Sequence, residues 1–228
     1  MEIPKKESFL SKLTIGTILL LSTLLLGSLN YAHAQGVSPY FGLGSGTDSA
    51  GTSTRCSPGQ LFDNFNNACE PAPTIGGVFG IFGVDFMFSP HLGVNGEYAF
   101  RFAQANYLPL AGLKFRPAFY DFNAVWEPIS GTRIVPVLEG GIGGARVALY
   151  ATQTTAITGI TSTASIPTGL NANHFQGHVA AGLKLYIRPS LFIKPQVDFH
   201  FVPHLTDQFG RDWVPQYTVS VGYTFGER

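Results

Sequence analysis

The sequence predicts an all-β fold, an eight-stranded antiparallel up-and-down transmembrane β-barrel preceded by a cleavable signal peptide. Three observations predict it. Apolar and polar side chains alternate with a period of two over most of the chain after Gln35, as expected for strands with two different faces. Short turns alternate with long polar loops, which is typical of transmembrane barrels. Charged residues form only 12% of the chain and aromatic residues 13%, a composition that favours a lipid-facing wall over a solvated surface.

The chain begins with a targeting segment. Three lysines precede an apolar run at 13–29, and residues 32–34 (Ala-His-Ala) have the small-x-small pattern of a signal peptidase site. We therefore predict that residues 1–34 are a signal peptide and that residues 35–228 form the barrel domain. An uncleaved anchor helix is the alternative, because the apolar run approaches the length needed to cross a bilayer.

Eight alternating segments follow the predicted cleavage site. In the segment 191–203, Ile193 and Val197 share one face, whereas Lys194 and Asp198 share the other. Most of the segments are at least as long as the roughly 9–11 residues that a tilted strand needs to cross a membrane. The predicted strands are 36–44, 75–88, 92–104, 111–126, 133–149, 174–188, 191–203 and 215–226.

Two irregularities interrupt this pattern. Pro117, Pro136 and Pro195 fall inside predicted strands, where each proline removes a hydrogen bond from the ladder. The alternation also changes phase near Pro117 and again near Arg146, and we predict a β-bulge at both places.

An even number of strands returns both termini to the end with the short turns, which would face the periplasm. The long loops at 45–74 and 151–173 then lie together at the outer end. Trp126 is predicted at the periplasmic interface, and Tyr107 and Trp213 at the outer one, where aromatic side chains gather in membrane proteins.

The only cysteines, Cys56 and Cys69, both lie in the first long loop. Because an exported chain meets an oxidising compartment, we predict that they form a disulfide. Closing so short a loop stabilises a protein by about 3 kcal/mol in the chain-entropy model.

The inward faces of the predicted strands carry charges of both signs. A barrel of eight strands is only wide enough for its interior side chains to fill, and unpaired buried charge is costly. We therefore predict a salt-bridge network that plugs the lumen, with a gated or narrow pore as the alternative. The predicted network comprises the acids Asp85, Glu97, Asp121, Glu139 and Asp198 and the bases Arg101, Lys114, Arg116, Lys184 and Lys194.

Net charge argues against nucleic-acid binding. Without residues 1–34, which contain three lysines and two glutamates, the 14 basic and 14 acidic residues fall to 11 and 12. A net charge of −1 provides no basic field for a polyanion. The glycine-rich runs at 76–83 and 140–144 lack the Lys-Ser/Thr pair of a phosphate loop, and we expect no cofactor.

The last segment, Tyr217-Thr-Val-Ser-Val-Gly-Tyr-Thr-Phe225, ends on an aromatic residue. Together with the signal segment, the amphipathic strands and the glycine-rich middle strands, it resembles the small outer-membrane β-barrel superfamily of outer membrane proteins A, X and W. The resemblance implies location in the bacterial outer membrane, contact with outer-membrane lipid, and assembly by the barrel-assembly machinery. In that family the final residue is usually aromatic, whereas Gly226-Glu227-Arg228 follow Phe225 here.

With a filled lumen and two long loops, we expect a structural or surface-presenting role, any surface ligand contacting loops 45–74 and 151–173, and a monomer. Transport of a small or apolar solute, as proposed for W-type barrels, is the alternative. A soluble lipocalin-like barrel with its apolar faces turned inward is a weaker one.

Four histidines lie near the outer ends of two consecutive predicted strands. Antiparallel pairing would bring His174 toward His204 and His178 toward His200, so that a zinc or copper site is geometrically possible. A polar lining without metal is the interpretation that we favour. No nucleophile, base and orienting acid can be assembled from the sequence, and we therefore expect no enzyme. A lipid A-modifying activity with His200 or His204 as base is the alternative.

Overall fold

The computed structural model describes residues 36–47, 55–63, 67–108, 113–157, 160–203, 209 and 212–226. The predicted signal peptide at 1–34 lies outside the described residues. Within the described part, the regular elements are β-strands except at Phe209, which is helical, and no helix there is long and apolar enough to cross a membrane.

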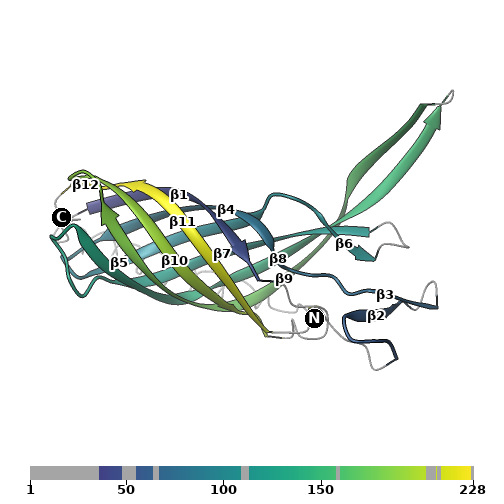
Figure 1. Ribbon diagram of the computed structural model, residues 1–228, viewed down its shortest axis with the longest axis horizontal. Coiled ribbons are helices and arrows are strands. Elements are labelled where there is room, and N and C mark those ends of the chain that lie inside the picture. The colour runs from purple at the N-terminus through teal and green to yellow at the C-terminus, as the bar shows by residue number, and fades with distance from the viewer. Residues whose placement is uncertain are drawn as a thin grey trace, which may run out of the picture. The chain divides into compact units, whose positions relative to one another are not determined.

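Eight antiparallel strands close into a barrel, which confirms the predicted fold class (Figure 1). Each strand pairs with the next along the chain, and the first pairs with the last from Tyr40↔Gly222 to Gly46↔Gln216. A two-residue strand, β12 (Phe225–Gly226), also pairs with the start of the first strand. The wall consists of β1 (Gly36–Gly46), β4 (Gly77–Met87), β5 (Leu92–Arg101), β7 (Leu113–Trp126), β8 (Ile134–Ile157), β9 (Ile160–Tyr186), β10 (Leu191–Phe201) and β11 (Trp213–Tyr223).

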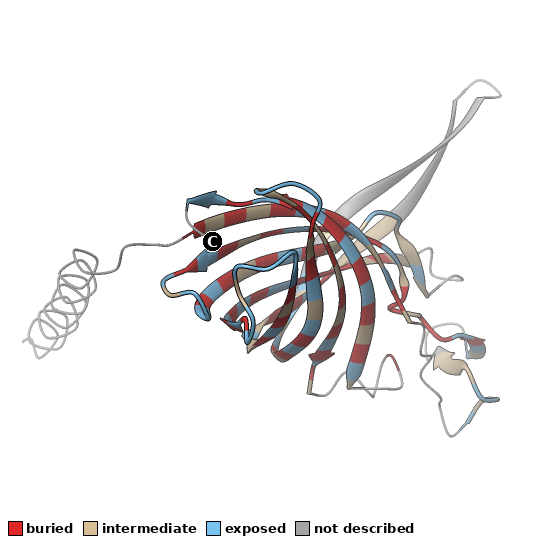
Figure 2. Cartoon of the chain, turned by 60° about the vertical axis from the view of Figure 1, so that its left-hand side comes forward, coloured by how far each residue is buried: buried red, intermediate tan, exposed pale blue. Residues whose placement is uncertain are grey.

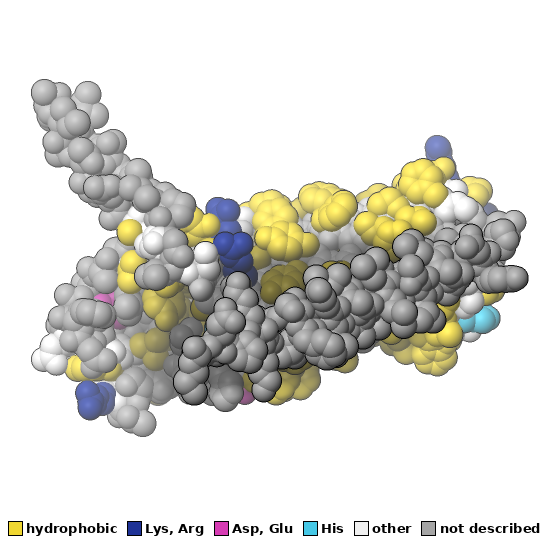
Figure 3. Space-filling view, turned by 180° about the vertical axis from the view of Figure 1, so that it is seen from behind, with side chains coloured by type: hydrophobic (Ala, Val, Ile, Leu, Met, Phe, Trp, Pro, Cys, Tyr) yellow, Lys and Arg dark blue, Asp and Glu magenta, His cyan; other side chains and the backbone are white. Residues whose placement is uncertain are grey.

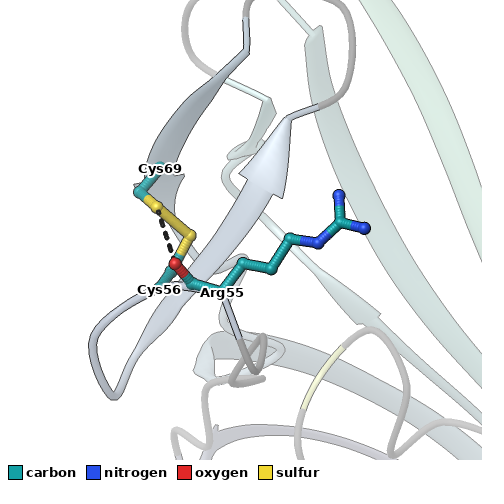
Figure 4. The surroundings of a disulfide bond; sticks show 3 residues. All are labelled: Arg55, Cys56 and Cys69. Atoms are coloured by element: carbon teal, nitrogen blue, oxygen red, sulfur yellow. Dashed lines mark hydrogen bonds between the residues drawn. A yellow bond between two sulfur atoms is a disulfide. The ribbon is translucent and has the colours of Figure 1, made fainter.

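The first long loop contains its own small sheet. Strands β2 (Gln60–Asp63) and β3 (Ala68–Pro71) form a hairpin, and the predicted disulfide between Cys56 and Cys69 is confirmed. Figure 4 shows this disulfide, with the Cys69 sulfur 3.8 Å from the carbonyl oxygen of Arg55. Residues 48–54 and 64–66 of this loop lie outside the described residues.

Two of the wall strands are much longer than predicted. The prediction of a loop at 151–173 is wrong, because β8 continues to Ile157 and β9 begins at Ile160. Beyond Ala151, β8 pairs only with β9, and the two strands extend past the rest of the wall (Figure 1). This segment is polar but rich in threonine and isoleucine, whose branched side chains favour strands. A short strand, β6 (Ala105–Leu108), lies beside β7 at the same end.

The predicted bulges near Pro117 and Arg146 are wrong. The pairing of β7 with β8 is continuous over the full length of β7, and a register shift occurs instead between Ala148 and Tyr150, where β8 faces β9. The apparent phase change has a different cause: the inward face of β7 itself changes from polar to apolar along the strand. Its inward side chains include the polar Asp121 and Asn123 and the apolar Phe115 and Phe119.

The prolines also leave the wall continuous. Opposite Pro195 the β9–β10 ladder omits two pairs, between Ile193↔Leu185 and Gln196↔Gly182, but the register is the same on both sides. Pairing through Pro117 and Pro136 is unbroken. The strands therefore form no lateral opening at these prolines.

Burial alternates along the wall strands wherever their side chains are described, as Figure 2 shows by its banded colouring. The outward side chains are mostly apolar and exposed, with Phe122 at 73%, and Figure 3 shows hydrophobic side chains on the part of the wall that described residues form in that view. The inward ones include buried charges such as Asp85 and Lys194. The lipocalin-like alternative is wrong, because it requires these charges to be solvated.

Candidate functional site

The barrel interior holds a polar belt bordered by apolar layers. Near the loop end, the inward side chains are aromatic and aliphatic, among them Phe79, Phe115 and Phe119. At the short-turn end, Met87, Val125 and Val137 form a second apolar cluster. The candidate site is the belt between them.

A relay of hydrogen bonds runs around the belt from β4 to β9. Asn95 Nδ2 donates to Asp85 Oδ1 at 2.6 Å, and Asn123 Nδ2 donates to Asn95 Oδ1 at 3.1 Å. Asn123 Oδ1 then lies 2.9 Å from Nδ1 of His178. A carboxylate such as that of Asp85 can only accept, so Asn95 must turn its NH2 group toward Asp85 and its oxygen toward Asn123. Asn123 is oriented in the same way, with its oxygen toward His178, and Nδ1 of His178 must therefore be the donor.

Two inward glycines of β8 make this relay possible. The Asn123–His178 contact passes over Gly141, and the hydrogen bond from Gln176 Nε2 to Asp121 Oδ1 passes over Gly143. A Cβ atom at either glycine would overlap a backbone carbonyl oxygen of β7. The glycine-rich run therefore lets side chains of β7 and β9 meet across β8.

Lys184 joins two carboxylates near the short-turn end. Its Nζ lies 2.8 Å from Asp85 Oδ2 and 2.6 Å from Glu127 Oε1. Glu127 was not among the predicted network residues, because it follows the last predicted residue of its strand. Inward side chains of β7, such as Asp121, occupy odd-numbered positions, and Glu127 continues this alternation. Extending the pattern past the end of the strand would have placed Glu127 in the interior.

Lys194 forms a second centre. Its Nζ lies 3.1 Å from Glu139 Oε1 and 3.7 Å from the centroid of the Tyr40 ring. The Tyr40 hydroxyl donates to Glu97 Oε2 at 2.6 Å. Tyr40 is thus a further interior group that was not predicted from the sequence, since its neighbours in β1 are mostly small and apolar.

Three of the predicted network bases lie elsewhere. Lys114 and Arg116 alternate with the inward side chains of β7, so they belong to the outward face, where the Arg116 guanidinium lies 5.9 Å from the centroid of the Tyr150 ring. The error follows from the misjudged phase of β7. Arg101 lies at the loop end of β5, and its Nη1 donates to the carbonyl oxygen of Thr74 at 3.0 Å.

The loop-end half of the belt contains two stacked histidines. The rings of His178 and His200, directly paired across β9 and β10, have centroids 4.7 Å apart, and Phe119 also stacks on His200 at 4.5 Å. His178 Nε2 lies 3.4 Å from Asp198 Oδ1, and His200 Nδ1 lies 3.7 Å from Asp121 Oδ2. One ligand atom each from Asp121, His178 and His200 lie within 4.8 Å of one another.

Asp198 connects this half of the belt to β11. Its Oδ1 accepts from Gln196 Nε2 at 2.5 Å, and its Oδ2 accepts from Thr218 Oγ1 at 3.2 Å.

The predicted proximity of His178 and His200 agrees with the structure. His174 is not part of the stacked pair, and His204 lies outside the described residues.

No protein-family model matches the chain, and no curated protein matches it. Solved structures of barrels do match the chain. The major outer membrane protein of Thermus thermophilus aligns with a TM-score of 0.51 at 11% identity, covering 83% of this chain and 99% of that one. The chain has the fold of an outer-membrane β-barrel. Its apolar outside and polar inside agree with that assignment, because barrels of this fold contact lipid with an apolar band.

Two further solved barrels are also similar to this chain. The attachment invasion locus protein Ail of Yersinia pestis aligns with a TM-score of 0.46 at 13% identity, covering 84% of this chain and 99% of that one. The N-terminal β-barrel domain of Pseudomonas aeruginosa OprF aligns with a TM-score of 0.44 at 10% identity, covering 82% and 97%.

Proposed function

We propose that this chain is a closed, non-conducting and non-enzymatic barrel of the bacterial outer membrane that presents surface structures to the medium. The observation that carries the proposal is the burial of the interior charges. Asp85 and Asp198 are 0% exposed, and Lys184 and Lys194 are 1% exposed. Side chains lining a water-filled channel would be solvated, whereas these are enclosed by their partners.

The filled interior supports the same proposal at both ends. Towards the loops, the aromatic side chains of Phe79, Phe115 and Phe119 are 0% exposed. Towards the short turns, a cavity of about 20 Å³ beside Glu127 and Lys184 has room for about one water molecule. A solute path through the lumen would require both ends to open.

The presented structures are the disulfide-tied hairpin and the extended β8–β9 hairpin. Both emerge at the end of the barrel opposite the short turns, as the long loops of outer-membrane barrels do. The edge of β9 from Ile160 to Gln176 pairs with no strand other than β8 among the described residues. Unpaired backbone groups of this kind can receive an extended segment of a partner protein.

Biogenesis completes the proposal. Residues 1–34 direct export and are removed, and the barrel-assembly machinery then inserts residues 35–228 as a monomer. Support comes from the targeting pattern of the first 34 residues and from the aromatic final strand ending at Phe225.

Planar-bilayer recording tests this function. Chain lacking residues 1–34 is refolded in detergent, and its closed barrel is verified by a faster gel mobility before heating than after. We expect no discrete conductance steps from this folded material. Reproducible single-channel steps would instead assign the alternative, a narrow pore, and would contradict a filled lumen.

A further inference from the structure

The barrel interior contains more negative than positive side chains. In the described part of the chain, six buried carboxylates face inward against two lysines, and the predicted balance of five acids and five bases is therefore wrong. Buried charge without a counter-charge is costly, so the interior needs further cations or protons. The carboxylates are Asp85, Glu97, Asp121, Glu127, Glu139 and Asp198, and the lysines are Lys184 and Lys194.

The lysines offset this charge unevenly. Lys184 pairs with Asp85 and Glu127, and Lys194 pairs with Glu139. Neither lysine makes an ion pair with the carboxylates nearer the loops, Asp121 and Asp198. Asp121 and Asp198 have only histidines as ion-pair partners among the described residues. The deficit of positive charge therefore includes the surroundings of the stacked histidines.

The hydrogen-bond relay fixes the tautomer of one histidine. Since Nδ1 of His178 donates to Asn123, the lone pair of a neutral His178 is on Nε2. That nitrogen lies 3.4 Å from Asp198 Oδ1, a second electron-pair donor. Two donors facing each other at this distance require a cation, either a proton on Nε2 or a metal ion.

His200 supplies a second available ligand. It is 0% exposed, and neither ring nitrogen makes a hydrogen bond of normal distance and angle among the described residues, although the side chain of Gln216 lies beside it. A buried polar group in this condition is unfavourable unless something else satisfies it. Its Nδ1 lies 3.7 Å from Asp121 Oδ2, while Asp121 Oδ1 already accepts a hydrogen bond from Gln176 Nε2.

From these observations we propose that Asp121, His178 and His200 bind a divalent transition-metal ion of the zinc class inside the barrel. Two imidazoles and one carboxylate form a ligand set that suits zinc and its first-row neighbours, whereas calcium and magnesium prefer oxygen ligands throughout. Asn123 is hydrogen-bonded to His178 and Gln176 to Asp121. Hydrogen bonds of this kind orient the ligands in established metal sites.

The geometry requires only a modest contraction. Metal–ligand distances of about 2.0–2.1 Å place neighbouring ligand atoms roughly 3.3 Å apart in a tetrahedral site. The three ligand atoms here lie within 4.8 Å of one another, so metal binding would require the side chains to rotate and bring these atoms closer by up to about 1.5 Å. The ion would add positive charge where the lysines do not reach.

Cobalt absorption spectroscopy tests the site. Tag-free chain is treated with EDTA, refolded in detergent with increasing cobalt(II), and its visible spectrum is recorded, because the site is sealed once the barrel has closed. We expect an intense d–d band that saturates at one equivalent and that is absent when excess zinc is present during refolding. His200→Phe, which keeps an aromatic ring beside Phe119, and Asp121→Asn should each weaken cobalt binding by roughly tenfold or more, as should the outer-shell change Asn123→Ala.

The matched control is His174→Phe, the same exchange on β9 but outside the triad, which should leave the affinity unchanged. Gel mobility before and after heating verifies that each variant has folded, and the three triad-directed variants give independent results if one fails. Absence of the band in folded protein would overturn the proposal. So would a band that survives both His200→Phe and Asp121→Asn, because cobalt would then bind at other histidines.

Discussion

In the half of the interior nearer the short turns, each buried lysine lies against carboxylates, whereas the described residues of the half nearer the loops include two stacked histidines and no buried lysine. Lys184 and Lys194 each make an ion pair of 3.1 Å or less. The closest histidine–carboxylate separations are 3.4 and 3.7 Å. The first half is thus held together by permanent charges, and the second by oriented hydrogen bonds and stacked rings. The two halves should respond differently when a single group is removed.

The largest expected effect comes from Lys184→Met. This change leaves Asp85 and Glu127 buried without their cation, and breaking a buried pair in this way costs about 3–5 kcal/mol. Urea unfolding in lipid vesicles, followed by tryptophan fluorescence, measures the loss. Lys114→Met is the control, because Lys114 lies on the outward face of β7 and its removal should change the free energy of unfolding little.

Gly141→Ala should have the next largest effect. The new methyl group would overlap the carbonyl oxygen of Phe122, so β7 and β8 must move apart. Overpacking of this kind costs about 1–3 kcal/mol. At Gly140, which points outward, the nearest atom to a new Cβ is 4.0 Å away. If Gly140→Ala were as destabilising as Gly141→Ala in the same urea assay, the claim that side chains of β7 and β9 meet across the inward glycines of β8 would be wrong.

Asn123→Leu tests the relay in the loop-end half. It leaves a donor on His178 and an acceptor on Asn95 without partners, and an unsatisfied buried polar group costs about 1–3 kcal/mol. Asn106→Leu on β6 provides the comparison, because Asn106 lies outside the buried belt. Equal unfolding midpoints for the two variants would show that the relay contributes nothing to stability.

The smallest effect on the barrel is expected from replacing both cysteines with serine. The disulfide joins Cys69 of β3 to Cys56, which precedes β2, and the β2–β3 hairpin shares no strand with the barrel sheet. The unfolding midpoint of the barrel should therefore stay unchanged, while a protease added from outside should cleave the hairpin faster. A large fall in the midpoint would mean that the hairpin is part of the barrel's cooperative unit.

Most of the wall was predictable because a period of two is a strong signal where one face contacts lipid and the other is polar. All eight strands and the short turns followed from it. The phase of β7 was not predictable in the same way, since Phe115 and Phe119 on its inner face are indistinguishable by type from Phe122 on its outer face. That ambiguity is why Lys114 and Arg116 were assigned to the wrong face.

The belt's detail depends on partners that are distant in sequence. Asn123 contacts His178 at a separation of 55 residues, and Lys184 contacts Glu127 at 57. No local pattern encodes these pairs. The β8–β9 extension was missed for a different reason, because its polar composition is typical of a loop while its backbone pairing is that of a strand.

The central claim, a closed interior within a lipid-facing wall, is tested most directly by labelling two neighbouring residues of β11. Thr218 points inward and Val219 points outward at 55% exposure, and both native cysteines are held in the disulfide. Thr218→Cys and Val219→Cys barrels in lipid vesicles are treated with a membrane-impermeant or a lipid-soluble maleimide. We predict that the lipid-soluble reagent labels only Val219→Cys and that the impermeant reagent labels neither. Rapid labelling of Thr218→Cys by the impermeant reagent would contradict the account, because it would show that water fills the lumen.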